Sequence, residues 1–224
     1  MIAVVKVGGA AVGAASTVAA MSSRGRQVAV VHGAGPQISV RCRQAGVAPR
    51  FVDGQRVTDE AVLGLVREGL AEVSDDLVAE LTAAGLAAEA VHDAFAGEPS
   101  ADGRLGFVGR VSAVDSARLR RVLRAGRMPV VSPLAGGLNV NADHAAAAVA
   151  GALGASELLF LSDVRGVLDR RGRVIRRIRV GDADGLIAAG HVTGGMIPKL
   201  QAGAAALAGG VWRVWIGAET MVTA

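Results

Sequence analysis

Aromatic residues and cysteine are scarce in this chain of 224 residues. There is no tyrosine, and only four phenylalanines and two tryptophans, which excludes the platform of exposed rings that single-stranded nucleic acids require. The single cysteine, Cys42, excludes an intrachain disulfide and a zinc site built from cysteines, so we expect a reducing, cytoplasmic setting. Hydrophobic residues make up 51% of the chain, which excludes a disordered protein and suits one well-filled core.

Long hydrophobic runs are also missing. The most apolar helical stretch, residues 145–155, is too short to span a bilayer and contains Gly151 and Gly154. The N-terminal segment is apolar, but its one charge, Lys6, lies inside the apolar run instead of ahead of it. We therefore expect neither a secretory signal peptide nor a membrane partner.

The formal net charge is +4, and the basic residues are mostly arginines spread along the chain. One dense cluster of arginines falls within residues 170–179. We interpret this cluster as a solvent-exposed hairpin in preference to a phosphate-binding surface. With few aromatic side chains beside it, nucleic acid is not an expected partner.

Lysine and asparagine are rare, and their positions are informative. The only lysines are Lys6 and Lys199, and the only asparagines are Asn139 and Asn141. In a chain this rich in alanine, glycine and arginine, a retained lysine suggests a role that arginine cannot fill. Lysine is a compact point charge that fits one phosphate oxygen in a tight pocket, whereas arginine is a broad planar fork. The alternative is that each of these lysines and asparagines is present by chance and has no special role.

Short β-rich runs alternate with longer helical segments, as in α/β folds with a mainly parallel sheet. The predicted strands are residues 2–7, 27–31, 129–132, 158–161 and 211–216. The predicted helices are residues 11–22, 36–45, 59–84, 115–125, 143–153 and 196–208. Thr58 is the predicted N-cap of the third helix, and residues 95–111 are predicted to form one or two hairpins. A seam at residues 133–137 divides the single domain, residues 1–224, into an N-lobe (1–133) and a C-lobe (134–224).

Glycine-rich turns follow the first two predicted strands. The first strand ends in Lys6-Val7-Gly8-Gly9, and the second is followed by His32-Gly33-Ala34-Gly35. At the carboxyl ends of parallel strands, such turns can present backbone N–H groups to an anion. Neither turn has the spacing of a Walker A loop or of a dinucleotide fingerprint, and an ordinary tight turn is the alternative for each.

Arg56 comes directly before the long third helix. Its guanidinium could clamp a substrate carboxylate with two parallel hydrogen bonds. The alternative is an ion pair with Asp53 or Asp59.

Further polar residues surround the starts of the last two predicted helices. Asn139 and Asn141 alternate on an extended segment, so both can face one cavity. Asp143 follows at a helix start, where it could hold both lysines in place or serve as a plain N-cap. Residues 194–195 lead into the last helix with Lys199 one turn in, and free N–H groups there suit a triphosphate.

The four histidines do not form a metal-binding pattern. His32, His92, His144 and His191 fall in separate elements, so we expect structural or surface roles and no metal ion held by protein side chains. Cys42 has no neighbouring base in the sequence, and we expect a buried structural thiol.

Eight segments, taken in order from Lys6 to Ile216, carry a resemblance. They read KVGG, HGAGPQI, FVDGQRVTD, GFVGRV, PVVSPLA, LNVNADHAAAAVA, LSDVRGVLD and GGMIPK. Together they resemble the amino acid kinase family, and most closely its branch that acts on N-acetyl-L-glutamate. The resemblance implies a three-layer αβα sandwich around a mainly parallel open sheet. It also implies ATP-dependent phosphorylation of the side-chain carboxylate of N-acetyl-L-glutamate, in arginine biosynthesis.

The resemblance implies roles for individual residues. Catalysis falls to Lys6, Asp143 and Lys199. Substrate binding falls to Gly33, Ala34, Gly35, Arg56, Asn139 and Asn141. Nucleotide binding falls to Gly8, Gly9, Ser162, Asp163, Val164, Gly166, Leu168, Thr193, Gly195 and Met196. ATP and Mg²⁺ are the implied cofactors, with Mg²⁺ on the ATP phosphates. The N-lobe would bind the acyl substrate and form the dimer, and the C-lobe would bind the nucleotide.

The sequence also departs from the family pattern. Ala34 stands where the family often has glycine, and residues 91–106 match poorly. The first helix is short, and the last helix before the closing strand is missing. No extension precedes the first strand, so we expect a homodimer without the arginine-inhibited hexamer that such an extension builds in the family.

Two other functions remain open at this point. The same fold could act on aminoadipate or glutamate linked to a carrier protein, whose acidic surface would suit the net charge of +4. The chain could also be a non-catalytic subunit that binds a nucleotide or an amino acid. Retention of both lysines together with Asp143 argues against the second.

Overall fold

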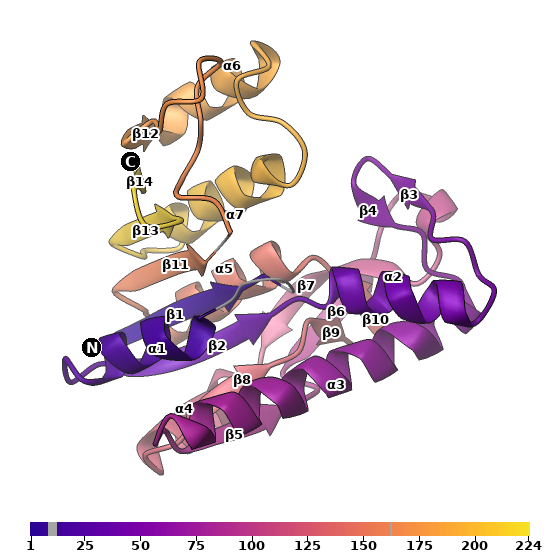
Figure 1. Cartoon of the computed structure of the whole chain (residues 1–224), viewed down its shortest axis with the longest axis horizontal. Coiled ribbons are helices and arrows are strands. Elements are labelled where there is room, and N and C mark those ends of the chain that lie inside the picture. Colours follow the sequence, from indigo (N-terminus) through magenta and orange to yellow (C-terminus); the bar gives the residue numbers. More distant parts are fainter. Residues whose placement is uncertain (9–12, 162) are drawn as a thin grey trace.

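The computed structural model describes residues 1–8, 13–161 and 163–224, and its centre is an eight-stranded sheet (Figure 1). The strand order is β12-β14-β13-β11-β1-β2-β8-β5. Every neighbouring pair is parallel except β13 and β14. The strands are β1 (Ile2–Val7), β2 (Gln27–His32), β5 (Ala88–Val91), β8 (Met128–Val131), β11 (Glu157–Leu161), β12 (Arg177–Arg179), β13 (Arg213–Ile216) and β14 (Thr220–Thr223). All five predicted strands are present, and β5, β12 and β14 were not predicted.

Helices cover both faces of this sheet. They are α1 (Ala14–Ser22), α2 (Gly35–Gln44), α3 (Glu60–Ala83), α4 (Ser116–Arg124), α5 (Ala142–Leu153), α6 (Ala183–Ala188) and α7 (Met196–Ala208). Two single-turn 3₁₀ helices are Gly103–Leu105 and Val180–Asp182. Within the described residues, no helix is long and apolar enough to cross a membrane. The six predicted helices are confirmed, and α6 was not predicted. Residues 11 and 12, the first two residues of the first predicted helix, lie outside the described part of the chain.

The core consists of two hydrophobic clusters, one on each face of the sheet. Helices α4, α5, α6 and α7 contribute to one cluster, and α1, α2 and α3 contribute to the other. Along β1, Val4 belongs to the first cluster and Val5 to the second, as expected for alternating side chains. Lys6 therefore shares the face of Val4 and points toward α5. This arrangement confirms the three-layer αβα sandwich.

The predicted N-cap of α3 is wrong. Asp59 caps this helix, because its backbone is extended and its carboxylate accepts a hydrogen bond from the N–H of Val62 at 2.9 Å. The hydroxyl of Thr58 donates instead to the carbonyl of Arg56 at 2.9 Å. Thr58 is thereby fixed at the end of the segment that carries Arg56.

A small closed barrel adjoins the sheet. It consists of β6 (Phe95–Pro99), β7 (Val108–Val114), β9 (Leu134–Ala135) and β10 (Leu138–Val140). Strands β6 and β7 form the hairpin predicted for residues 95–111, and its closure with β9 and β10 was not predicted. Strand β10 leads into α5, so the barrel sets the direction in which the start of α5 faces.

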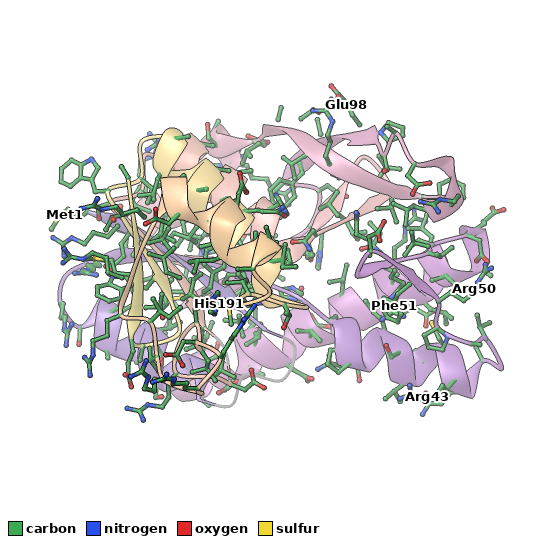
Figure 2. All side chains as sticks on the ribbon, turned by 90° about the horizontal axis from the view of Figure 1, so that it is seen from above. Met1, Arg43, Arg50, Phe51, Glu98 and His191 are labelled. Carbon is green, nitrogen blue, oxygen red and sulfur yellow. The ribbon has the colours of Figure 1, made fainter. Side chains whose placement is uncertain are left out.

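A second hairpin, β3 (Phe51–Val52) and β4 (Gln55–Arg56), precedes α3. Its turn consists of Asp53 and Gly54, both with positive φ, as in the tight turns that suit two-residue hairpins. Seen from above, Phe51 lies toward the end of the molecule opposite Met1 (Figure 2).

The arginine cluster is exposed, as the sequence predicts. All six arginines of residues 170–179 are exposed, and Leu168 and Val174 bridge a turn between them. Residues 177–179 pair with β14, not with the preceding segment, so the cluster extends beyond one hairpin. The division into two lobes stays a prediction, and β1 of the N-lobe pairs with both β2 and β11, so one sheet runs through both.

Gly106 provides a stability test. It has φ of +67°, and a Cβ there would lie 2.4 Å from the carbonyl oxygen of Thr58. Gly85 has φ of +79°, but its Cβ would meet nothing within 4 Å. We expect Gly85→Ala to lower the free energy of unfolding by about 1 kcal/mol through backbone strain alone. Gly106→Ala should cost about 3 kcal/mol or more, because the backbone contact must also open. Urea unfolding measures both, and equal costs would contradict the contact.

Candidate active site

A cavity of about 510 Å³ lies at the carboxyl ends of β1 and β2 and is bordered by the barrel, the β3–β4 hairpin and the starts of α5 and α7. It brings together twelve of the residues singled out from the sequence. These are Lys6, Gly8, Gly33, Ala34, Gly35, Arg56, Asn139, Asn141, Asp143, Asp163, Gly195 and Lys199. The carboxyl edge of a parallel sheet is the usual ligand site of such folds.

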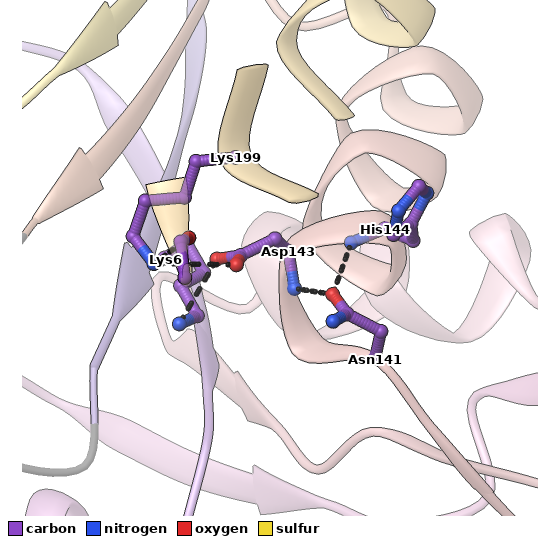
Figure 3. Close-up of polar contacts among 6 residues, drawn as sticks. Lys6, Asn141, Asp143, His144 and Lys199 are labelled. Atoms are coloured by element: carbon purple, nitrogen blue, oxygen red, sulfur yellow. Dashed lines mark hydrogen bonds and ion pairs between the residues drawn. The ribbon is translucent and has the colours of Figure 1, made fainter. Parts of the chain in front are cut away.

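The carboxylate of Asp143 faces both lysines (Figure 3). Its Oδ1 is 3.0 Å from Nζ of Lys6, and its Oδ2 is 3.3 Å from Nζ of Lys199. The side chains are 7% exposed for Asp143, 9% for Lys6 and 15% for Lys199. Lys199 also donates a hydrogen bond to the carbonyl oxygen of Gly195 at 3.3 Å.

One carboxylate thus faces two ammonium groups, which leaves an excess of positive charge beside the cavity. Burial lowers the pKa of Lys6, the Asp143 carboxylate opposes that shift, and the Lys199 charge adds to it. Each lysine makes the other costly, so a bound anion would relieve their repulsion. The cluster is built to receive negative charge.

Asn141 explains how Asp143 is available for this role. The Oδ1 of Asn141 accepts hydrogen bonds from the N–H groups of Asp143 at 2.8 Å and of His144 at 3.2 Å. Asn141 is therefore the N-cap of α5, and Asp143 lies in its first turn. The interpretation of Asp143 as a plain N-cap is wrong, and its carboxylate is left for the lysines.

Arg56 is 8% exposed and makes no ion pair with Asp53 or Asp59 among the described residues. Its Nη2 donates to the carbonyl oxygen of Gly35 at 2.9 Å and to Oγ of Ser39 at 2.7 Å. Its guanidinium lies 4.8 Å from the ring centre of Phe51. Its Nη1 is buried without a hydrogen-bond partner in the described part of the chain, so an anionic ligand would supply a missing acceptor.

The two asparagines face one cavity, as their spacing predicts. Both line it, and Nδ2 of Asn139 donates to Oγ1 of Thr58 at 3.1 Å. Sequence reasoning missed Ser39 and Phe51, which hold Arg56. Neither has a local signal, because each meets Arg56 only through the folded arrangement of α2 and the β3–β4 hairpin.

Three helices of the described chain begin at this cavity. Gly35 starts α2, Ala142 starts α5, and Gly195 precedes α7, and all three residues line the cavity. The helix dipole makes each of these ends favourable for an anion, and no side chain caps the first N–H groups of α2 and α7. Gly33 lies directly beside the lysine, since a Cβ there would be in ordinary van der Waals contact with Nζ of Lys6, at 3.9 Å.

Five residues predicted to bind nucleotide are not among those that line this cavity. Val164, Gly166, Leu168, Thr193 and Met196 do not line it. Gly166 has a packing reason to be glycine, since a Cβ there would lie 2.4 Å from a side-chain oxygen of β14. Two further predicted positions, Gly9 and Ser162, lie outside the described residues.

A buried hydrogen-bonded chain lies beside the glycine-rich turn. Nε2 of His32 is 2.8 Å from Oγ of Ser74, which lies 3.2 Å from Oγ of Ser132. Nδ1 of His92 is 2.8 Å from that same Ser132 oxygen. Burial lowers the pKa of His32 to about 4. His32 and His92 both belong to this hydrogen-bonded chain, and no group of three or more metal-binding side chains occurs in the residues the structure describes.

The lowered pKa of His32 predicts a loss of stability in acid. As the pH falls from 6.5 toward about 4, His32 takes up a proton in the unfolded chain but not in the folded one. From about pH 7 to about pH 5, the free energy of unfolding should fall by about 2 kcal/mol through this residue. The variant His32→Gln should lack this component, so its urea unfolding should depend less steeply on pH. Parallel curves for both proteins would contradict the assignment.

Comparison with known proteins identifies the family. The protein-family model described as "Amino acid kinase family" matches residues 1–218 of this chain. The acetylglutamate kinase of Sinorhizobium medicae is 38% identical over 242 residues, covering 95% of this chain and 82% of the relative. The acetylglutamate kinase of Geobacillus kaustophilus is 41% identical over 213 residues, covering 90% and 81%.

Solved structures agree. The protein smu.665 of Streptococcus mutans superposes with a TM-score of 0.92 at 28% identity, covering 99% of this chain and 98% of that one. N-acetylglutamate synthase of Neisseria gonorrhoeae, complexed with coenzyme A and N-acetyl-glutamate, superposes with a TM-score of 0.87 at 25% identity. The match covers 100% of this chain and 59% of the synthase. From its sequence, its sheet and its relatives, the chain belongs to the amino acid kinase family.

Proposed function

We propose that this protein transfers the γ-phosphoryl group of ATP to the side-chain carboxylate of N-acetyl-L-glutamate, giving N-acetyl-L-glutamyl 5-phosphate in arginine biosynthesis. The observation that carries the proposal is the buried Lys6–Asp143–Lys199 cluster at the wall of a cavity where helices begin. The acetylglutamate kinases at 38–41% identity support the substrate.

The chemistry needs positioning and charge more than proton transfer. The acceptor carboxylate is already ionised at neutral pH, so no general base is required. Its oxygen forms a bond to the γ-phosphorus while the bond to the bridging oxygen of ADP breaks, with the two oxygens in line. Lys6 and Lys199 stabilise the charge on the moving group, and Asp143 holds both lysines in place.

The remaining polar groups would fix the acid. Arg56 offers its unpaired Nη1 to a carboxylate of the substrate. Asn139 and the N–H groups of Ala34 and Gly35 would orient the rest of it, since the N–H of Gly33 already donates to the carbonyl oxygen of Val7 at 3.0 Å. Gly8 and the start of α7 would cradle the phosphates.

Mg²⁺ fits this site as a companion of the nucleotide. The acidic side chains that line the cavity are Asp143 and Asp163, and Asp143 is held by two lysines. Since the described residues form no cluster of three metal-binding side chains, the phosphates of ATP would be the main ligands. When bound, Mg²⁺ would neutralise phosphate charge.

We further propose a cytoplasmic homodimer acting on a small acidic substrate. The single cysteine, Cys42, is free and buried, which fits a reducing compartment. Light scattering of the purified chain tests the assembly state.

The activity can be tested by trapping the product. We expect the purified protein, given ATP, Mg²⁺ and N-acetyl-L-glutamate, to form an acyl phosphate that hydroxylamine converts to a coloured hydroxamate. Lys6→Ala and Lys199→Ala should abolish the colour while leaving the fold intact by circular dichroism. If the protein binds ATP but phosphorylates no acid, the proposed function is wrong.

A conservative substitution tests the role of Lys6 more sharply. Lys6→Arg keeps the charge, but the planar guanidinium cannot occupy a site shaped for one ammonium group 3.0 Å from Asp143. We expect kcat to fall by about 100-fold or more, in the range seen when one transition-state donor is removed. Arg127→Lys, the reverse exchange in an exposed ion pair with Glu89, is the matched control and should change kcat little. Near-normal turnover of Lys6→Arg would remove Lys6 from the mechanism.

A further inference from the structure

A second cavity, of about 1120 Å³, lies beside the first, between β7 on one side and α5 and α7 on the other. The two cavities share five lining residues, Gly54, Gln55, Val140, Asn141 and Gly195. A ligand in the first cavity can therefore continue into the second. The reaction proposed above does not use this space, because N-acetyl-L-glutamate is small.

The walls of the second cavity are mainly apolar and short. Helix α5 contributes Ala147, Ala148 and Gly151, and α7 contributes Ile197 and Pro198. Because these side chains are small, the two helices leave room between themselves and β7. Surfaces of this kind favour an apolar ligand over water.

The charged groups of the second cavity do not suit a nucleotide. Among the described residues that line it, the ionisable ones are Asp53, Arg110 and His144. Arg110 is already paired with Glu98 of the neighbouring strand β6. Burial lowers the pKa of His144, and Asp143 only partly opposes it, so the imidazole is neutral at neutral pH. A triphosphate would find no unpaired cation here.

Two carboxamide side chains, those of Gln55 and Asn141, lie at the border between the cavities. The Oδ1 of Asn141 is used by the backbone of α5, as Figure 3 shows. Its Nδ2 has no hydrogen-bond partner among the described residues, and Asn141 lines both cavities. A carboxamide N–H at the entrance to an apolar cavity matches the carbonyl oxygen of an amide whose substituent runs into that cavity.

We propose that the second cavity binds the chain of an N-acyl-L-glutamate whose acyl group is longer than acetyl and apolar. Nδ2 of Asn141 donates to the acyl carbonyl, and the chain lies in the space bordered by β7, α5 and α7, against Ala148 and Gln201. This inference rests on the proposed phosphorylation of the glutamate side chain and extends its substrate class. The bonds made and broken at phosphorus are unchanged.

The test compares three acids by steady-state kinetics with ATP and Mg²⁺. These are N-acetyl-L-glutamate, N-hexanoyl-L-glutamate, and N-acetylglycyl-L-glutamate, a polar extension of similar length. Each buried methylene strengthens binding by about fourfold, so we expect the hexanoyl compound to have a KM at least about tenfold below that of the acetyl compound. A hexanoyl compound with the lower kcat/KM, or a polar compound that matches it, overturns the proposal.

Filling the cavity gives the second arm of the test. Ala148→Trp on α5 and Gln201→Trp on α7 each place an indole in this cavity, so each should raise KM for the hexanoyl acid at least tenfold and change KM for the acetyl acid less than twofold. Ala71→Trp, on the exposed surface of α3 and away from both cavities, is the matched control. Hexanoyl kinetics unaffected by both filling variants would overturn the assignment of this cavity.

The two proposals fail in different ways. If the acetyl acid is phosphorylated and the hexanoyl acid is not, only the proposal of a longer acyl substrate is overturned. Phosphorylation of neither acid, with ATP binding intact, overturns the kinase function and this inference with it. Phosphorylation of the hexanoyl acid alone supports acyl-chain binding in the second cavity. It also means that the longer acid, and not the acetyl acid, is the substrate.

Discussion

The sharing of one buried carboxylate by two lysines is the constraint around which this molecule is arranged. Lys6 comes from β1, Asp143 from α5 and Lys199 from α7, and the three side chains are almost fully removed from water. A buried ammonium group is costly unless a counter-ion is close. The positions of β1, α5 and α7 are therefore coupled, and a displacement of any one of them would leave a charge unpaired.

The cap of α5 shows how this constraint reaches the backbone. Oδ1 of Asn141 accepts hydrogen bonds from the first N–H groups of the helix. If Asp143 were the cap, its carboxylate would accept these bonds and would not be available to the lysines. Asn139, two residues earlier on β10, reaches Thr58 just before α3. One short extended segment thus joins the barrel, the long helix and the lysine cluster, which explains why both asparagines of the chain lie there.

Much of this site could be foreseen from composition and order along the chain. Rarity alone singled out Lys6, Lys199, Asn139 and Asn141, and the cavity brings all four together. Partners that depend on packing between distant elements could not be foreseen. Ser39 and Phe51 meet Arg56 through α2 and a hairpin, and the barrel closes through strands of two or three residues that carry almost no periodic signal. The cap of α3 was missed because Thr58 and Asp59 are both good capping residues, and only the backbone geometry separates them.

The order of the lysine cluster along the chain has a consequence for folding in time. Lys6 lies near the start, and Lys199 pairs with an aspartate 56 residues before it. During synthesis, β1 and α5 can meet while α7 is still to be made, but the second ion pair and the start of α7 must wait for the C-terminal quarter of the chain. Contacts between residues this far apart in sequence form slowly, because a long loop must close, at a cost in chain entropy, before the contact can stabilise it. The active centre is therefore among the last parts of this molecule to be completed.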